Sequence, residues 1–401
     1  GILQSSGFLD LKSLMALSRT CKANMIDELS LTMFIENEIT RYHGVSTMEK
    51  TIVFLRNIYR SPLLKQWLER DYGWCTNGTT TTTESIKVTR RMLTDAVPYE
   101  VMLSKMLKTV PTESERLELV SEQDEKGRTL LHNVARSRNP ESIKTVLALY
   151  PESERLNALS LKEEYGWTVL HWAVSSNHAE STKLIITSFP ESERFQYICA
   201  VENNGCTVLH RAASSNNPEL IKLILALLPE TECLQVLSMQ DRYENTALHC
   251  AAQSGHAEVI KTVLALYPES HLLKALNMTN EDEKNVLHCA VDSNDIECIK
   301  TVLSHYPESE RIHAVRMAHH DGCTALHSAA RLGNFEAIAT ILAIYPESER
   351  LQALNETDRY GDTVLRLVAG SNNVECIKAV LSLYPESERL HLVSMEDRSE
   401  E

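Results

Sequence analysis

Apolar residues recur at helical spacing along most of this 401-residue chain. Ile260, Val263, Leu264 and Leu266, for example, fall on one face of a helix, with polar residues between them. Similar stripes return at a fixed interval through the last three quarters of the chain, separated by short polar stretches. This pattern predicts an all-α protein made of repeated helical units.

The repeat is marked by the string Tyr-Pro-Glu-Ser-Glu-Arg. Seven prolines of this string follow one another at 39-residue intervals: Pro151, Pro190, Pro229, Pro268, Pro307, Pro346 and Pro385. The full string stands at Tyr150–Arg155, Tyr306–Arg311, Tyr345–Arg350 and Tyr384–Arg389, and an upstream copy at Val110–Arg116 has one extra residue. A fixed period of this size is typical of a solenoid.

A second landmark has the form Thr-x-Leu-His and returns with the same period. It stands at Thr129–His132, Thr168–His171, Thr207–His210, Thr246–His249, Asn285–His288, Thr324–His327 and, with Arg in the last place, Thr363–Arg366. The Thr hydroxyl suits a helix N-cap, and the Gly that precedes it in most units permits a tight turn. Asn or Gly six residues after the His suits the end of that helix. Each unit is therefore predicted to be turn, helix, turn, helix.

These units resemble the ankyrin repeat. The match is close at Thr246–Ile260 and nearly as good at Thr324–Ile338, and the resemblance covers about 280 residues in seven units. It implies a helical solenoid that binds a protein partner on its concave face. The period of 39 exceeds the usual 33. We expect the extra residues to form a third short helix in each unit, at about Pro151–Leu159 in the first.

The amino-terminal part differs from the repeats. Four apolar sets in residues 1–72 predict a small helical domain, and Phe8–Lys22 resembles the middle of an F-box. The resemblance implies binding to a Skp-family adaptor of a cullin–RING ubiquitin ligase, through Phe8, Leu9, Leu11, Leu14, Leu17 and Cys21. The usual Leu-Pro opening and the Trp often found in that family are absent. The alternative is that these leucines form the core of a helical cap on the array.

The domain boundaries follow from these patterns. We expect a helical domain at 1–72, a linker at 73–94, a partial capping repeat at 95–120 and seven ankyrin-like units at 121–401. The last residues, Met395–Glu401, align with Met239–Asn245, after which Thr246 opens a helix. Because an array needs a polar closing repeat, we expect the natural protein to continue.

Charge narrows the choice of partner. Residues 1–94 carry 12 Lys and Arg against 9 Asp and Glu, so residues 95–401 carry 28 against 46, a net charge of −18. So acidic an array suits neither nucleic acid nor an anionic membrane. The ten cysteines show no disulfide or zinc spacing, and no apolar run reaches the roughly 18 residues of a membrane span. We expect a cytoplasmic protein. The near-identical units also resemble the repeat arrays of effectors that intracellular bacteria inject into eukaryotic hosts, and for such an effector we expect a location in the host cytosol.

Candidate chemistry is scarce. The motif histidines are expected to bond within their own turns, and the cluster His319, His320, Cys323 and His327 matches no strong zinc signature. No phosphate loop, nucleophile elbow or pair of isolated carboxylates stands out. We therefore expect no catalytic residue, no metal, no cofactor and no enzyme activity in the array.

A partner should instead meet the positions that differ between units, since constant positions serve the fold. These lie at the tips of the β-hairpin fingers and on the first helix of each unit. Tyr, Trp and Arg dominate binding hot spots, and the expected partner-binding residues are Lys126, Arg128, Tyr165, Trp167, Trp172, Arg211, Arg242, Tyr243, Arg331, Arg359 and Tyr360. Tyr165, Trp167 and Trp172 fall in one unit beside Arg211 in the next, which makes them the expected centre. The alternative is that both Trp side chains only pack against neighbouring fingers.

Three functions remain open. The first is a binding protein whose array selects a partner while the F-box-like domain recruits a ubiquitin ligase. The second is a scaffold or an inhibitor without a link to ubiquitin. The third is an enzyme whose catalytic part lies in the helical domain or beyond residue 401.

Overall fold

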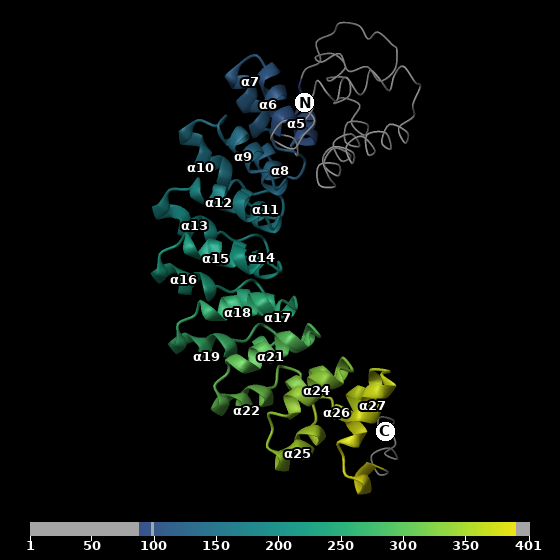
Figure 1. The fold of residues 1–401 in the computed structure, drawn as a ribbon. Helices are drawn as coiled ribbons and strands as arrows, with labels where there is room; N and C mark the ends of the chain where they lie inside the picture. Colours follow the sequence, from purple (N-terminus) through teal and green to yellow (C-terminus); the bar gives the residue numbers. More distant parts are fainter. Residues whose placement is uncertain (1–87, 98–99, 390–401) are drawn as a thin grey trace, which may run out of the picture. The chain divides into compact units, whose positions relative to one another are not determined.

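The computed structural model describes residues 88–97 and 100–389, and these form an all-helical array without any strand (Figure 1). The F-box-like segment lies outside the described residues. The chain divides into two compact units, Gly1–Ala158 and Leu159–Glu401.

The described residues of unit 1 form two sets of three helices. Its elements are α5 (Arg90–Ala96), α6 (Glu100–Thr109), α7 (Glu113–Ser121), α8 (Leu130–Arg136), α9 (Pro140–Leu147) and α10 (Glu152–Ser160), the last of which crosses the unit boundary. Helix α5 packs beside α8, and α6 beside α9. Thr89 caps α5 with its side chain, as the motif threonines do in later repeats. The first repeat therefore begins before the predicted boundary at residue 95, inside the segment expected to be a linker.

Unit 2 repeats the same three-helix plan, and its helices follow one another in chain order from α11 to α27 in Figure 1. Its first helices are α11 (Val169–Ser175), α14 (Val208–Ala213), α17 (Ala247–Gln253), α20 (Val286–Asp292), α23 (Ala325–Arg331) and α26 (Val364–Gly370). Its second helices are α12 (Ala179–Thr187), α15 (Pro218–Ala226), α18 (Ala257–Ala265), α21 (Ile296–His305), α24 (Phe335–Leu342) and α27 (Val374–Ser382). First helices pack on first helices and second on second, which buries the predicted apolar stripes.

The predicted third helix is confirmed. In unit 2 it is α16 (Glu230–Leu237), α19 (Glu269–Asn277) and α22 (Glu308–Arg316), while two repeats begin it with a 3₁₀ turn, as η1 (Glu191–Glu193) before α13 (Arg194–Ile198) and η2 (Glu347–Glu349) before α25 (Arg350–Asn355). The proline precedes the helix in the N-cap position, for example Pro307 before α22. The glutamates that follow it lie in the first turn, where the helix dipole favours negative charge.

The tyrosine and the arginine of the repeated string hold this third helix in place. The Tyr306 hydroxyl donates to the backbone oxygen of Leu276, 30 residues earlier in the third helix of the preceding repeat, at 2.9 Å. Tyr267, Tyr345 and Tyr384 make the same bond to carbonyls 30 residues earlier. Arg311 folds back and donates from Nε to the Tyr306 carbonyl at 3.2 Å. The string is therefore a connector between successive repeats.

The motif histidine replaces the glutamate of an ordinary capping box. In α17 the Thr246 side chain accepts from the backbone N–H of His249, while the Thr246 N–H donates to Nδ1 of His249 at 3.2 Å. The expectation that these histidines bond only within their own turns is wrong, because the other nitrogen reaches the next repeat. Nε2 of His249 meets the Met278 carbonyl at 3.0 Å, and Nε2 of His210 meets the Asn245 carbonyl at 2.9 Å.

Candidate protein-binding surface

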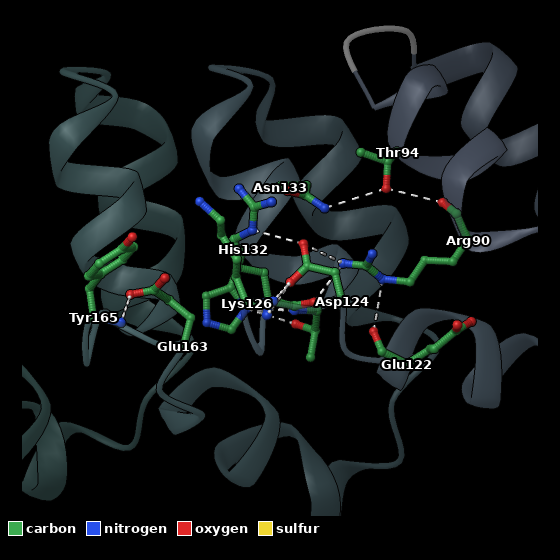
Figure 2. Close-up of polar contacts among 11 residues, drawn as sticks. Arg90, Thr94, Glu122, Asp124, Lys126, His132, Asn133, Glu163 and Tyr165 are labelled. Atoms are coloured by element: carbon green, nitrogen blue, oxygen red, sulfur yellow. Dashed lines mark hydrogen bonds and ion pairs between the residues drawn. The ribbon is translucent and has the colours of Figure 1, made fainter. Parts of the chain in front are cut away.

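Most fingers, the segments that precede the first helix of each repeat, are tight turns closed by one side-chain acceptor. The carboxylate oxygen Oδ1 of Asp241 accepts from the backbone N–H of Tyr243 and of Asn245, each at 2.9 Å. Glu163 does the same for Tyr165 and Trp167, at 2.8 and 3.2 Å; Figure 2 shows the bond to Tyr165. The predicted β-hairpins are thus reduced to turns, with isolated bridges only at Ala318–Thr324 and Thr357–Thr363 among the described residues.

Neighbouring fingers of unit 2 are joined by backbone hydrogen bonds. The N–H of Asn203 donates to the Tyr165 carbonyl at 3.0 Å, and that of Arg242 to the Asn204 carbonyl at 2.8 Å. The same bond recurs at Glu281, His320 and Arg359. The finger tips of unit 2 therefore form a continuous edge whose side chains differ from repeat to repeat.

Three of the predicted partner-binding side chains meet in one cluster of unit 2. The Trp167 and Trp172 rings lie 5.0 Å apart between centroids, tilted by 55°. The Arg211 guanidinium lies over the Trp167 ring, 4.8 Å from its centroid, in the geometry of a cation–π contact. All three side chains are half-buried, and Tyr165 beside them on the finger tip is 52% exposed.

A buried carboxylate fixes the arginine of this cluster. Oε1 of Glu202 accepts from an Arg211 terminal nitrogen at 3.0 Å, and the Glu202 side chain is only 2% exposed. Glu202 occupies the finger position of Asp241 and Glu163. The sequence pattern does not distinguish Glu202, because at that position every unit carries a residue suited to closing the turn.

The other predicted residues of unit 2 lie apart from this cluster. Arg242, Tyr243, Arg359 and Tyr360 are exposed on later fingers, and the Tyr360 hydroxyl donates to Asp321 at 3.1 Å. Arg331, also exposed at the end of α23, donates to the sulfur of Cys323 at 2.8 Å. They share the finger edge and first-helix positions but form no second aromatic cluster among the described residues.

The two predicted residues of unit 1 stabilise their own finger. Arg128 pairs with the Asp124 carboxylate at 2.8 Å, and the Lys126 N–H donates to the same carboxylate at 3.0 Å. Arg90 also approaches Asp124, at 3.6 Å, and donates to the Glu122 carbonyl (Figure 2). Partial burial raises the pKa of Asp124, but the bonds from Arg128 and from the Lys126 N–H together outweigh it and hold that pKa below its usual value.

The thiols of the array are protonated at neutral pH. Burial raises the pKa of Cys206 to about 12 and that of Cys323 to about 11. Because the thiolate is the nucleophilic form, neither sulfur is activated for catalysis. In the part of the chain that the structure describes, no helix is both long and apolar enough to cross a membrane.

Comparison with known proteins agrees with the repeat geometry. The family model for ankyrin repeats (three copies) matches in five overlapping segments, 113–196, 131–238, 191–272, 226–312 and 269–350. No curated protein matches the sequence. Together the five segments span 113–350, more than half of the 401 residues.

Two solved structures resemble the chain at 19% identity and a TM-score of 0.48, each covering 64% of this chain while 99% of its own length is matched. One is the ankyrin repeat domain of Bcl-3, described as a unique member of the IkappaB protein family. The other is the human ASB11 ankyrin repeat domain. On the strength of the family match, the chain belongs to the ankyrin-repeat family, whose stacked repeats form protein–protein interaction modules.

Proposed function

We propose that the ankyrin array binds a protein partner along the finger edge of unit 2, with the contact centred on Tyr165, Trp167, Trp172 and Arg211. The observation that carries this proposal is the arrangement of Arg211. Its guanidinium lies over Trp167 while the buried carboxylate of Glu202 holds it from the other side. An anchor held in this way loses little conformational entropy when a partner covers it.

The composition of the cluster supports the same proposal. Trp, Tyr and Arg are the residue types most enriched in energetic hot spots, where a few side chains supply most of the affinity. The cluster also differs from the equivalent positions of the other repeats, where the Trp167 position holds Cys206, Asn245 or Lys284. A surface that distinguishes one repeat from its neighbours can select a partner, whereas a constant one cannot.

Site-specific photo-crosslinking tests where the partner sits. A photoreactive phenylalanine analogue is placed at Tyr165 and, in a control chain, at Leu266, the C-cap residue of α18, which is 37% exposed. In eukaryotic lysate we expect one discrete adduct from position 165, and excess unlabelled protein should suppress its formation. We expect no adduct from position 266. Equal adducts from both positions would place the partner elsewhere.

We also propose, from the sequence of Phe8–Lys22 alone, that residues 1–72 recruit a Skp-family adaptor and that the chain acts in a eukaryotic cytosol as an effector. The array would then present its partner to a ubiquitin ligase. This second proposal is supported by the resemblance of the leucine spacing to an F-box. The alternatives are a scaffold or inhibitor without that link, or an enzyme with its catalytic part outside the array.

Purified components test the second proposal. The full chain should retain a purified Skp-family adaptor on a column, while a chain without residues 1–72, or one carrying Leu11→Asp and Leu14→Asp, should not. Retention of no adaptor by the full chain would remove the ubiquitin link and leave the array as a scaffold or an inhibitor. The photo-crosslinking result on the array would stand in either case.

A further inference from the structure

The tyrosine of the repeated string bridges successive repeats, but two copies of the string lack it. Where it is present, its hydroxyl donates to a backbone carbonyl 30 residues earlier, in the third helix of the preceding repeat. This bond is made at 2.8–3.2 Å by Tyr150, Tyr267, Tyr306, Tyr345 and Tyr384. Phe189 and Leu228 stand at the same place in the other two copies. Neither side chain carries a donor, so the bridge cannot form there.

Both missing bridges belong to one repeat of unit 2. Phe189 follows α12, and the carbonyl that a tyrosine there would meet is that of Leu159 in α10. Leu228 follows α15, and the corresponding carbonyl is that of Ile198 in α13. The repeat made of α11, α12 and α13 therefore has no tyrosine bridge to either neighbour. We call it the unbridged repeat; every later junction among the described residues of unit 2 carries a bridge.

The arginine of the string is also unused at these two junctions. In the copy at Tyr306, Nε of Arg311 donates to the Tyr306 carbonyl and closes the string on itself. Nε of Arg194, at the same position, is buried and makes no hydrogen bond among the described residues. In the next copy Cys233 replaces the arginine, and its sulfur bonds only to carbonyls of its own repeat.

Phe189 is packed inside its own repeat instead. Its ring stacks on that of Tyr197 in α13, with centroids 4.1 Å apart and an angle of 18° between the planes. The Tyr197 hydroxyl in turn bonds to Glu193 at 3.4 Å. The stack therefore couples the second and third helices of the unbridged repeat to each other, where a tyrosine would couple it to the preceding repeat.

The finger side of the same repeat stays joined to the next one. The Asn203 N–H donates to the Tyr165 carbonyl at 3.0 Å, and Nε2 of His171 meets the Cys206 carbonyl at 3.3 Å. These bonds lie at the fingers and first helices, whereas the missing bridges lie at the third helices. Separation of the third helices here breaks no tyrosine bond and leaves the finger bonds as a pivot.

We propose that the unbridged repeat is a hinge of unit 2, at which the edge formed by the third helices opens more readily than elsewhere. Each repeat of a solenoid is held only by its neighbours, so a repeat without bridges on both sides opens locally at a lower free energy. The unbridged repeat is also the one that carries Trp167 and Trp172. Because Arg211 lies over Trp167 from the next repeat, opening of the hinge changes the contact cluster. That link to binding rests on the proposed function, whereas the hinge itself does not.

Hydrogen exchange of the full chain, followed by mass spectrometry, measures local opening. The repeat of α23, α24 and α25 is the matched comparison, because its third helix also begins with a 3₁₀ turn but Tyr345 and Tyr384 bridge it on both sides. We expect the amides of α12 and α13 to exchange faster than those of α24 and α25. Phe189→Tyr combined with Leu228→Tyr should restore both bridges and slow exchange in α12 and α13 by about 3- to 10-fold, the effect of one hydrogen bond at each junction.

Tyr306→Phe combined with Tyr345→Phe is the reverse variant, since it removes both bridges of the repeat of α20, α21 and α22. Exchange in α21 and α22 should quicken by a similar factor while that in α12 and α13 stays as it was. Equal exchange of the two compared repeats in the unaltered chain, or exchange that neither pair of substitutions alters, would overturn the hinge. Absence of a photo-crosslinked partner at position 165 would count against the proposed function and leave the exchange result unaffected.

Discussion

Arg211 and Trp167 come from neighbouring repeats, and the guanidinium of the first lies over the ring of the second at 4.8 Å. The pair depends on Glu202, whose carboxylate is almost wholly buried beneath the arginine. Removal of the arginine therefore affects more than the surface, because it leaves a buried charge without its partner.

Arg211→Ala should destabilise the array by roughly 1–3 kcal/mol, since a buried charge that loses its hydrogen-bonding partner carries its full desolvation cost. Arg242→Ala is the matched control, because Arg242 is exposed on the next finger and no side-chain bond is described for it. Chemical denaturation measures both. Equal stability of the two variants would show that Glu202 does not depend on Arg211.

Tyr306→Phe should cost about 1–3 kcal/mol, because it leaves the Leu276 carbonyl without its donor inside the stack. Tyr243→Phe, on an exposed finger tip, should leave the unfolding free energy within about 0.5 kcal/mol of the starting value. Thermal unfolding followed by circular dichroism compares them. A Tyr306→Phe chain as stable as Tyr243→Phe would contradict the connector role of the repeated string.

Gly205→Ala should destabilise the array more than Gly361→Ala. Both glycines have positive φ, 78° and 79°, so both substitutions carry the same backbone strain of about 1–2 kcal/mol. A Cβ at Gly205 would also lie 2.7 Å from the Arg242 backbone nitrogen, whereas nothing lies within 4 Å of one at Gly361. A comparison of the denaturation midpoints of the two variants separates the effect of backbone strain from that of steric collision. Equal losses of stability in both would mean that adjacent fingers do not touch at Gly205.

Acid should destabilise the array before its carboxylates titrate. Burial lowers the pKa of His171 and His249 from 6.5 to about 4, so the unfolded chain binds more protons than the folded one between those values. Stability is therefore fully present above pH 6.5 and falls as the pH drops from 6.5 towards 4, by up to about 1.4 kcal/mol for each unit of pKa difference per histidine.

His249→Gln tests this pH dependence of stability, because glutamine can keep the capping box of the helix but does not titrate. Its melting temperature should vary less with pH in that window than that of the unaltered chain. A melting temperature that stays constant down to pH 4.5 in the unaltered chain would show that the motif histidines keep their ordinary pKa when folded.

The sequence predicted the repeat plan because its signals are local. Period, caps and apolar stripes identify the helices, and the proline with its glutamates predicted the third helix. The sequence did not predict what this string does, since the bond from Tyr306 to Leu276 joins residues 30 apart that meet only after the repeats stack. It likewise placed Trp167, Trp172 and Arg211 near each other, but the buried position of Glu202 required the packed structure.

The finger at His319–Asp321 shows the same limit. Spacing along the chain grouped His319 with Cys323 and His327, whereas the structure turns those two to other partners and places His288, 31 residues earlier, beside His319.

The most direct test of the central claim is the affinity of the array for the partner that position 165 captures. Tyr165→Ala and Trp167→Ala should each weaken binding by 2 kcal/mol or more, about 30-fold, as hot-spot residues do. Leu266→Ala should bind as the unaltered chain does, and Tyr165→Ala should melt at an unchanged temperature. Unchanged affinity in both aromatic variants would place the binding surface elsewhere on the array.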